Sequence, residues 1–380
     1  MFSQKAEKIP PFHVMEVLEK AQELERQGNS IIHLEIGEPD FPTAPHICEA
    51  AIQTMRAGKT KYTHSLGLPE LRLAVAEYYN GKFGLGLTQE QVIITSGTSP
   101  ALLLLFLGLL EQGDEVVMSN PYYACYPNFV EYLGGKAVHV HTGEENGFSL
   151  EPEAVAGAVT RQTKAVLINS PCNPTGHVMN SRKMKELTGI CDSVPVISDE
   201  IYQGLVYKGQ DHSILEFTDN AFVLNGFSKL FAMTGWRLGY LISPPGYIRQ
   251  LQKLQQNFFI CANSFVQHAG VAALRGPMDH VKEMVATYDK RRRYMLRRLK
   301  DIGFGIKTEP EGAYYILANA KEFGSDSFLL CRRILEEAGV AVTPGIDFGD
   351  GAEGYIRFSY ASGQDNIKEG MDRIEKYLNG

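Results

Sequence analysis

The sequence NGFSKLFAMTGWRLGY, residues 225–240, follows an apolar run and holds one lysine and one arginine, Lys229 and Arg237. Lys229 comes after a small polar turn, and Arg237 lies eight positions later (237 − 229). This stretch alone fits two interpretations of Lys229 equally well: a solvated surface charge or a functional residue. The stretches on either side decide between the two.

Upstream of this stretch, from residue 92 onward, apolar runs of strand length alternate with helical ones. The strand-like runs are QVIITS, DEVVMS, GKAVHVH, TKAVLINS, VPVISD and AFVLNGF (residues 91–96, 114–119, 135–141, 163–170, 194–199 and 221–227). Near-continuous β-branched runs separated by helices indicate a mostly parallel sheet that helices cover on both faces. Ligands of such sheets bind at the carboxyl ends of the strands. The loops after these runs are therefore expected on one rim.

The chain has 380 residues, which is too long for one ordinary core, so we expect two domains. We assign residues 46–285 to a large cofactor-binding domain. Residues 1–45 and 286–380 are assigned to a smaller α/β domain. In that part, residues 312–318 and 355–361 (GAYYILA and YIRFSYA) indicate short antiparallel strands.

The composition argues against several classes of partner and site. A net charge of −7 argues against nucleic acid or an anionic membrane as the main partner, and no apolar run is long enough to span a bilayer. The basic run at residues 290–298 is therefore expected to be a solvated helix face. Six cysteines without a C-x-x-C pair favour reduced thiols in a cytoplasmic protein. His139 and His141 alternate on a strand without a third ligand, so we predict no metal site.

The loop SGTS (residues 96–99) opens a helix whose start suits an anion. Ser99 is a natural N-cap and Pro100 a natural first helical residue. Free N–H groups and the helix dipole at such a start favour a phosphate. Arg237 can add a bidentate guanidinium, and Ser228 can add a hydroxyl.

Other rim residues suit an aromatic ring. Asp199 ends an apolar strand, where a carboxylate is costly unless paired; facing a pyridine nitrogen, it would keep that nitrogen protonated. Tyr202 and Asn173 can hydrogen-bond a phenolic oxygen, and Tyr123 can stack on the ring. With Lys229 forming an imine, these are the contacts that pyridoxal phosphate needs.

Three motifs, NSPCNPTG, SDEIY and SKLFAMTGWRLGY, resemble in their order and spacing those of the class I/II aminotransferases of fold type I. IGEPDFPT, KYTHSLGLPELR, SGTS and YIRFSYA extend the resemblance over nearly the whole chain, and it is greatest to the bacterial and archaeal aspartate, aromatic and alanine aminotransferase subgroup. The resemblance implies an α/β fold with a large, mostly parallel sheet covered by helices and a smaller α/β domain. It also implies pyridoxal 5'-phosphate as the cofactor.

The resemblance assigns roles to individual residues. It implies catalytic roles for Lys229 as the Schiff-base lysine and proton shuttle, Asp199 as the partner of the ring nitrogen, and Tyr202, which shares the ring oxygen with Asn173. The residues that it implies at the rest of the cofactor are Thr98, Ser99, Ser228 and Arg237 at the phosphate and Tyr123 over the ring.

Three further residues match the family at the substrate and subunit contacts. Tyr62 resembles the tyrosine that reaches the phosphate of the neighbouring subunit, which implies a homodimer with shared active sites. Arg357 resembles the arginine that binds the substrate α-carboxylate, with Gly37 closing over it and Asn173 beside it. One departure is Gly226, where much of the family has a serine or threonine, so one phosphate hydroxyl is missing.

The implied reaction moves an amino group from an L-amino acid to a 2-oxo acid, with 2-oxoglutarate and glutamate as one pair, in a two-stage exchange. The same groups would also serve a pyridoxal-phosphate β-lyase acting on cystathionine-like substrates. A non-catalytic regulator would carry an added DNA-binding segment, which we do not expect because the family pattern begins near the first residue. Some aspartate-using relatives have a lysine where this chain has Ser99; its absence favours neutral or aromatic donors, although a cation from the partner subunit could still meet an acidic one.

Overall fold

The computed structural model describes residues 2–191 and 193–380, and its main feature is a seven-stranded sheet with the order β2-β8-β7-β6-β5-β3-β4. Neighbouring strands from β7 through β4 pair in parallel. This arrangement confirms the predicted mostly parallel sheet. The strands are β2 (Val92–Thr95), β3 (Glu115–Asn120), β4 (Lys136–His141), β5 (Thr163–Asn169), β6 (Val196–Asp199), β7 (Ala221–Gly226) and β8 (Gly239–Ile242).

Strand β8 was not predicted from the sequence. It lies between β2 and β7 and is antiparallel to both. Its four residues, GYLI, form an apolar run too short to show a strand period. The chain therefore turns back after Lys229 and re-enters the sheet beside the strand that precedes this lysine.

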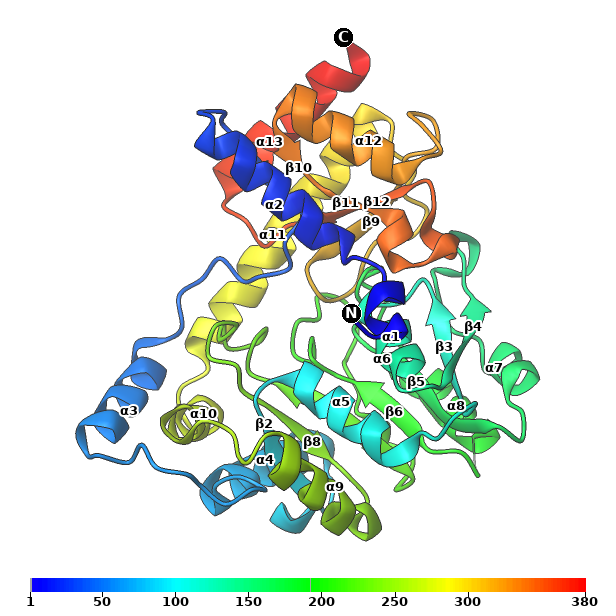
Figure 1. Ribbon diagram of the computed structural model, residues 1–380. Helices are drawn as coiled ribbons and strands as arrows, with labels where there is room; N and C mark the ends of the chain where they lie inside the picture. The colour runs from blue at the N-terminus through cyan, green and yellow to red at the C-terminus, as the bar shows by residue number, and fades with distance from the viewer. Residues whose placement is uncertain (1, 192) are drawn as a thin grey trace.

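Helices cover both faces of the sheet, as Figure 1 shows. Side chains of one strand alternate between two buried clusters, one on each face. One face packs against α5 (Thr98–Leu109), α6 (Cys125–Tyr132) and α9 (Pro245–Phe258). The helices on the other face include α4 (Pro69–Phe83), α7 (Pro152–Ala158), α8 (Ser181–Ile190) and α10 (Ser264–Arg275), with α3 (Pro45–Arg56) against α10. Helix α5 is apolar on nearly all sides because it lies between the sheet and α9.

A second, smaller sheet has the order β11-β12-β9 (Thr343–Pro344, Tyr355–Ser359 and Tyr315–Asn319). Its pairs are antiparallel, which confirms the expectation for residues 312–318 and 355–361. The N-terminal segment joins this part of the molecule, since β1 (Ile32–His33) pairs in parallel with β10 (Val340–Ala341). The surrounding helices are α2 (His13–Arg26), α12 (Ser327–Arg333) and α13 (Gln364–Asn379), and a π-helical turn follows α12 at Ile334–Ala338. Helix α1 (Gln4–Lys8) lies instead beside α6, where the Lys5 amine donates to the carbonyl oxygen of Tyr132 (2.9 Å).

Helix α11 (Asp279–Ile302), in yellow in Figure 1, extends from beside α10 to the part of the molecule that holds the small sheet. It is continuous through position 285/286, so the domain division drawn there stays a prediction. The expectation that its basic run is solvated is wrong for two residues, because Arg291 and Arg292 are buried. Arg291 donates to both carboxylate oxygens of Asp40 (2.7 and 2.9 Å), and Arg292 donates to Asp289 (2.8 Å). A helix that connects two packed units buries more than one face, and buried guanidinium groups need such partners.

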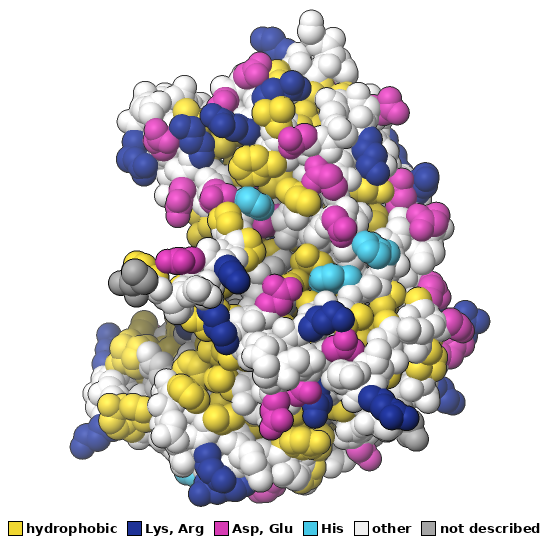
Figure 2. Space-filling view, turned by 45° about the vertical axis from the view of Figure 1, so that its right-hand side comes forward, with side chains coloured by type: hydrophobic (Ala, Val, Ile, Leu, Met, Phe, Trp, Pro, Cys, Tyr) yellow, Lys and Arg dark blue, Asp and Glu magenta, His cyan; other side chains and the backbone are white. Residues whose placement is uncertain are grey.

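The surface carries charges of both signs. On the face shown in Figure 2, lysine and arginine side chains are interspersed with aspartate and glutamate. The six cysteines all carry free thiols. Within residues 2–191 and 193–380, no helix combines the length and apolar character needed to cross a bilayer.

Candidate active site

A cavity of about 400 Å³ lies where the parallel strands end, between the large sheet, the small sheet and the N-terminal segment. Its lining includes eleven of the twelve residues that we predicted for the site: Gly37, Thr98, Ser99, Tyr123, Asn173, Asp199, Tyr202, Ser228, Lys229, Arg237 and Arg357. The twelfth, Tyr62, lies outside this lining and is 82% exposed. Its predicted contact is with a neighbouring subunit, so that role stays a prediction.

Lys229 follows β7 by three residues and extends its amine into this cavity. Its Nζ donates to the carbonyl oxygen of Gly37 (2.6 Å) and lies 5.8 Å from the centre of the Tyr202 ring. Burial lowers the pKa of the amine from 10.5 to about 8, and the positive charges of Arg357 and Arg237 add to the effect. At pH 7 about one tenth of this amine is therefore unprotonated, far more than of an ordinary lysine, and a nucleophile or a base requires that form.

Asp199 is the last residue of β6, and its carboxylate is buried. The Tyr126 hydroxyl donates to Oδ2 (2.6 Å) and the Ile201 backbone N–H donates to Oδ1 (3.1 Å). Burial raises the pKa of this carboxyl to about 6, although both hydrogen bonds oppose the rise. A cationic group in the cavity would stabilise the ionised form, so the site suits a protonated ring nitrogen.

Arg357, on β12, is 3% exposed and lies against two aromatic rings. The guanidinium carbon is 4.3 Å from the centre of the Tyr315 ring and 4.8 Å from that of Phe348. Nη1 donates to Oδ1 of Asn173 (2.9 Å), and Nη2 donates to the carbonyl oxygen of Glu35. Within the described residues, Nε has no hydrogen-bond partner. A buried guanidinium with a spare donor suits a carboxylate ligand.

The start of α5 differs from the prediction. The helix begins at Thr98 with Gly97 as its N-cap, so Ser99 and Pro100 lie inside the first turn instead of at the N-cap and first position. Gly97 has φ +111°, and a Cβ there would lie 2.7 Å from Nη2 of Arg237. The positive φ, which glycine adopts without steric cost, explains why a glycine and not a serine caps the helix. The helix start, Ser228 and Arg237 still line the same cavity.

Gly226 pairs with Gly239 across β7 and β8. A Cβ on Gly239 would lie 2.7 Å from the carbonyl carbon of Gly97, so three backbone segments meet beneath the helix start. A Cβ on Gly226 would lie 3.0 Å from the carbonyl oxygen of Leu238, so a side chain here requires a small shift of β8. The local packing thus matches the absence of the hydroxyl that much of the family has at this position.

Gly37 has a steric reason to be glycine. A Cβ on this residue would lie 1.7 Å from the Tyr315 hydroxyl oxygen, far inside van der Waals contact. The same hydroxyl lies 2.8 Å from that of Tyr202. The Gly37 carbonyl accepts from both Lys229 and Tyr314, so this backbone position is fixed from two sides.

Gly37→Ala is therefore expected to displace either this loop or Tyr315 and to lower kcat/KM by about tenfold or more, since misplacement by 1 Å can cost up to about a hundredfold. Gly81→Ala is a matched control, because a Cβ on Gly81 meets no atom within 4 Å. Steady-state kinetics of both variants would check the effect. Equal kcat/KM for Gly37→Ala and the parent chain would contradict it.

Several lining residues were not predicted. Tyr126 and Asn169 contact Asp199, since Asn169 Nδ2 donates to its carbonyl oxygen (2.9 Å). Asn169 is the last residue of β5, and Tyr126 lies in the first turn of α6, six residues after the end of β3 (126 − 120). A systematic search of polar residues at and after the end of each strand would have found them. Tyr315 comes from the small sheet. The remaining ones are Glu38, Ile201, Thr234 and five apolar side chains of the N-terminal segment (Phe12, Val14, Met15, Leu18 and Ile36). Apolar residues of an amphipathic helix give no signal that separates a cavity wall from a core.

The family model for aminotransferase class I and II matches residues 29–374. The chain is 41% identical to a (5-formylfuran-3-yl)methyl phosphate transaminase of Methanocaldococcus jannaschii, over the full length of both chains. It is 38% identical to an aspartate aminotransferase of Pyrococcus horikoshii, over 97% of this chain and 94% of the relative. The structure of Thermus thermophilus aspartate aminotransferase with maleate superposes with a TM-score of 0.96 at 37% identity, covering 100% of both chains.

These matches extend over the whole fold and the whole site. Enzymes of this family use pyridoxal phosphate, and their substrates differ, as the names of the relatives show. The chain belongs to the aminotransferase class I and II family.

Proposed function

We propose that this aminotransferase binds pyridoxal 5'-phosphate in the cavity and moves an amino group from an L-amino acid to a 2-oxo acid, with 2-oxoglutarate and glutamate as one pair. The observation that carries the proposal is that the Lys229 amine, with a pKa lowered to about 8, shares one cavity with the Asp199 carboxylate and the Arg357 guanidinium. The cofactor, when bound, supplies an aldehyde for covalent attachment of amines and a ring that accepts electron density from the substrate Cα.

The cavity offers groups for each part of the cofactor. The start of α5 with Thr98 and Ser99, together with Ser228 and Arg237, would hold the phosphate. The residues that would hold the ring are Asp199 at its nitrogen, Tyr202 and Asn173 at its oxygen, and Tyr123 over its face. Tyr62 would reach the phosphate of a neighbouring subunit, which supports a homodimer with shared sites. The free thiols support a reducing, cytoplasmic location.

Lys229 is proposed to take the proton from the substrate Cα at Nζ and to return it later in the reaction. Its lowered pKa serves this role, because a base works best with a pKa near the operating pH. Arg357 would orient the substrate through its α-carboxylate, so that the Cα proton faces this amine. The aromatic rings on either side of Arg357 exclude water and so strengthen that contact.

Arg357→Lys is expected to raise KM for the amino acid by about 10- to 100-fold, with a smaller effect on kcat. An ammonium cannot reproduce the planar two-donor contact with a carboxylate, and a hydrogen bond to a charged group contributes about 1.5–3 kcal/mol. Initial rates over a range of donor concentrations would measure KM. An unchanged KM would mean that the α-carboxylate is held elsewhere.

The donor is proposed to be a neutral or aromatic amino acid. Five apolar side chains from residues 12–36 line the cavity. Ser99 occupies the position where some aspartate-using relatives have a lysine. An apolar wall gives an acidic side chain no partner. A half-reaction screen that follows the absorbance of the bound cofactor against each amino acid would rank the donors.

The same experiment, extended, tests the reaction type. Holoenzyme mixed with the best donor and 2-oxoglutarate should form glutamate in equal amount to the 2-oxo acid from the donor. A β-lyase would instead release ammonia and form no glutamate. A chain that stays colourless with excess pyridoxal phosphate would overturn the proposal as a whole.

A further inference from the structure

Resting on the proposed function, we infer that Glu200 is a positioning residue: it joins the ends of β6 and β7 on the sheet face that packs against α4 and thereby sets the place of Asp199 relative to Lys229. Glu200 follows Asp199 directly in the chain. Successive side chains of a strand point to opposite faces, and the surroundings of the two carboxylates agree. Asp199 contacts Tyr126 of one core cluster, whereas Glu200 contacts Tyr79 of the other.

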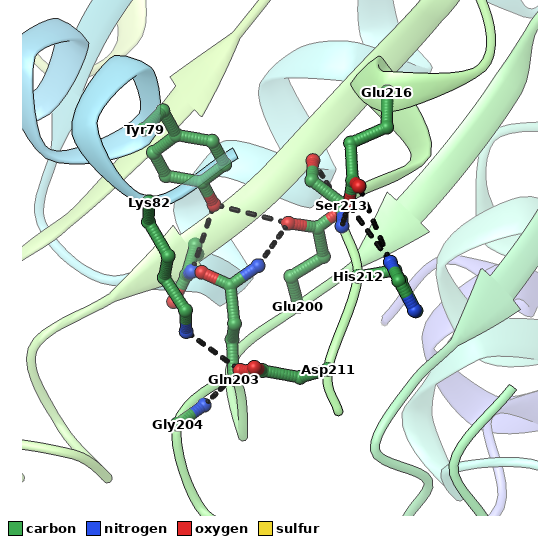
Figure 3. A network of polar contacts seen from close by, with 10 residues as sticks. Tyr79, Lys82, Glu200, Gln203, Gly204, Asp211, His212, Ser213 and Glu216 are labelled. Carbon is green, nitrogen blue, oxygen red and sulfur yellow. Dashed lines mark hydrogen bonds and ion pairs between the residues drawn. The ribbon is translucent and has the colours of Figure 1, made fainter. Parts of the chain in front are cut away.

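The Glu200 side chain is fully buried and accepts hydrogen bonds from five neutral donors. Oε1 accepts from the Ser198 and Ser213 hydroxyls (3.1 and 3.0 Å) and from the Ile214 backbone N–H (3.0 Å). Oε2 accepts from the Tyr79 hydroxyl (3.1 Å) and from Nε2 of Gln203 (2.8 Å). Figure 3 shows the Glu200 carboxylate with Tyr79, Gln203 and Ser213 around it. Such a group fixes several elements at once.

The contacts tie the strand that carries Asp199 to the strand that leads to Lys229. The Tyr79 hydroxyl, which donates to Glu200, accepts from Nδ2 of Asn225 (2.9 Å). Asn225 lies on β7, four residues before Lys229 (229 − 225), and its Oδ1 accepts from the next backbone N–H (2.7 Å). The backbone N–H of Glu200 also donates to the carbonyl of Leu224 (2.8 Å). One carboxylate thus connects both strand ends and helix α4.

The hydrogen bonds to this carboxylate favour its ionised form, but its burial disfavours that form more strongly. All five contacts place a donor against a carboxylate oxygen, and hydrogen bonds to the charged form stabilise it. Burial opposes this and raises the pKa of Glu200 to about 7. An amide at this position would turn one acceptor into a donor facing Tyr79 or Ser213, so the network would have to rearrange.

Further contacts hold residues 211 and 212, which precede Ser213, next to this cluster. Asp211 accepts from the Lys82 amine (2.6 Å) and from the Gly204 backbone N–H (2.7 Å), and His212 contacts Glu216 (3.2 Å). Figure 3 shows both pairs beside the Glu200 cluster. Glu216 also accepts from the Ser213 backbone N–H (2.8 Å), so a change at Glu216 would act on a partner of Glu200. Glu77, a surface residue of α4 that accepts from Arg275 of α10 (2.8 Å), offers a control with similar chemistry outside this cluster.

The test compares purified holoenzymes of the parent chain, Glu200→Gln and Glu77→Gln. For Glu200→Gln we expect kcat per bound cofactor to fall by about 10- to 100-fold, the cost of a misplacement near 1 Å. KM for the donor should stay within about twofold, since the contacts of Arg357 are untouched. The ratio of the visible absorbance bands of the bound cofactor, at one fixed pH, should change. Glu77→Gln should match the parent in all three measurements, because it removes only a surface ion pair with Arg275.

A purely structural role would lower the melting temperature of Glu200→Gln and leave kcat, KM and the absorbance ratio at parent values, and that result would overturn the inference. Should Glu200→Gln fail to fold, Tyr79→Phe replaces it, because this change removes the link to Asn225 and leaves the carboxylate with four donors. It should show the same kcat loss at smaller size, about threefold. If the parent chain binds no pyridoxal phosphate, the proposed function fails; if it binds and transaminates while both variants match it, only the role of Glu200 fails.

Discussion

Lys229→Ala should abolish covalent capture of pyridoxal phosphate and lower transamination by about 10⁴-fold or more, the upper range for loss of a general acid–base group. The structure gives the reason. The Lys229 amine lies in the cavity beside the groups proposed for the cofactor, and its lowered pKa makes it reactive there. Its one hydrogen bond, to the Gly37 carbonyl, contributes little to folding, so the variant should stay folded.

The measurement is borohydride reduction of the chain after incubation with pyridoxal phosphate, followed by peptide mass analysis. The parent chain should carry the reduced cofactor on Lys229 alone, at one per chain. Lys253→Ala, which removes an exposed lysine on α9, is the control and should behave as the parent. Stoichiometric capture by the Lys229→Ala chain, on any other residue, would exclude Lys229 as the attachment site.

The sequence predicted the rim of the site well because a parallel sheet imposes a simple geometry. All strands of such a sheet end at the same edge, so the residues after each strand converge whatever their distance in the chain. Asp199 ends β6 and Lys229 follows β7, and both line one cavity as predicted. The helix start at Thr98 joins them because β2 ends just before it.

The features that could not be predicted from the sequence depend on contacts between distant segments. Tyr79 and Glu200 are 121 residues apart and meet across a face of the sheet. Arg291 looked solvated because nothing local marks Asp40, 251 residues away, as its partner. Strand β8 was missed since its pairing on both sides, not its four residues, defines it.

The cavity residue that comes from the small sheet, Arg357, could be predicted only from the family resemblance. Arg357 lies in a strand of ordinary apolar pattern, and no spacing rule connects it to Asn173, 184 residues earlier. Its burial between Tyr315 and Phe348 becomes apparent only when the second sheet is packed against the first. Resemblance therefore supplied the residue, and the fold supplies the physical reason for its orientation.

Asp199→Ala should leave cofactor binding largely intact and lower the transamination rate by about 10²- to 10³-fold, the usual cost of losing one preorganised electrostatic group in an active site. The phosphate contacts proposed at α5 and Arg237 and the covalent link at Lys229 do not involve this carboxylate. What is lost is the negative charge that would keep the ring nitrogen protonated. That proton makes the ring a better acceptor of electron density.

Asp199→Asn separates charge from shape, and it should show most of the same loss. An asparagine oxygen can still accept from Tyr126 or from the Ile201 N–H, which now hold the carboxylate, but it carries no charge to favour a protonated ring. Cofactor occupancy would be read from absorbance, and rates would be expressed per bound cofactor, so that weak binding is not mistaken for slow chemistry. If Asp199→Asn turned over at the parent rate, the carboxylate would have only a packing role; if Asp199→Ala alone were slow, the loss would come from the cavity that it leaves and not from charge.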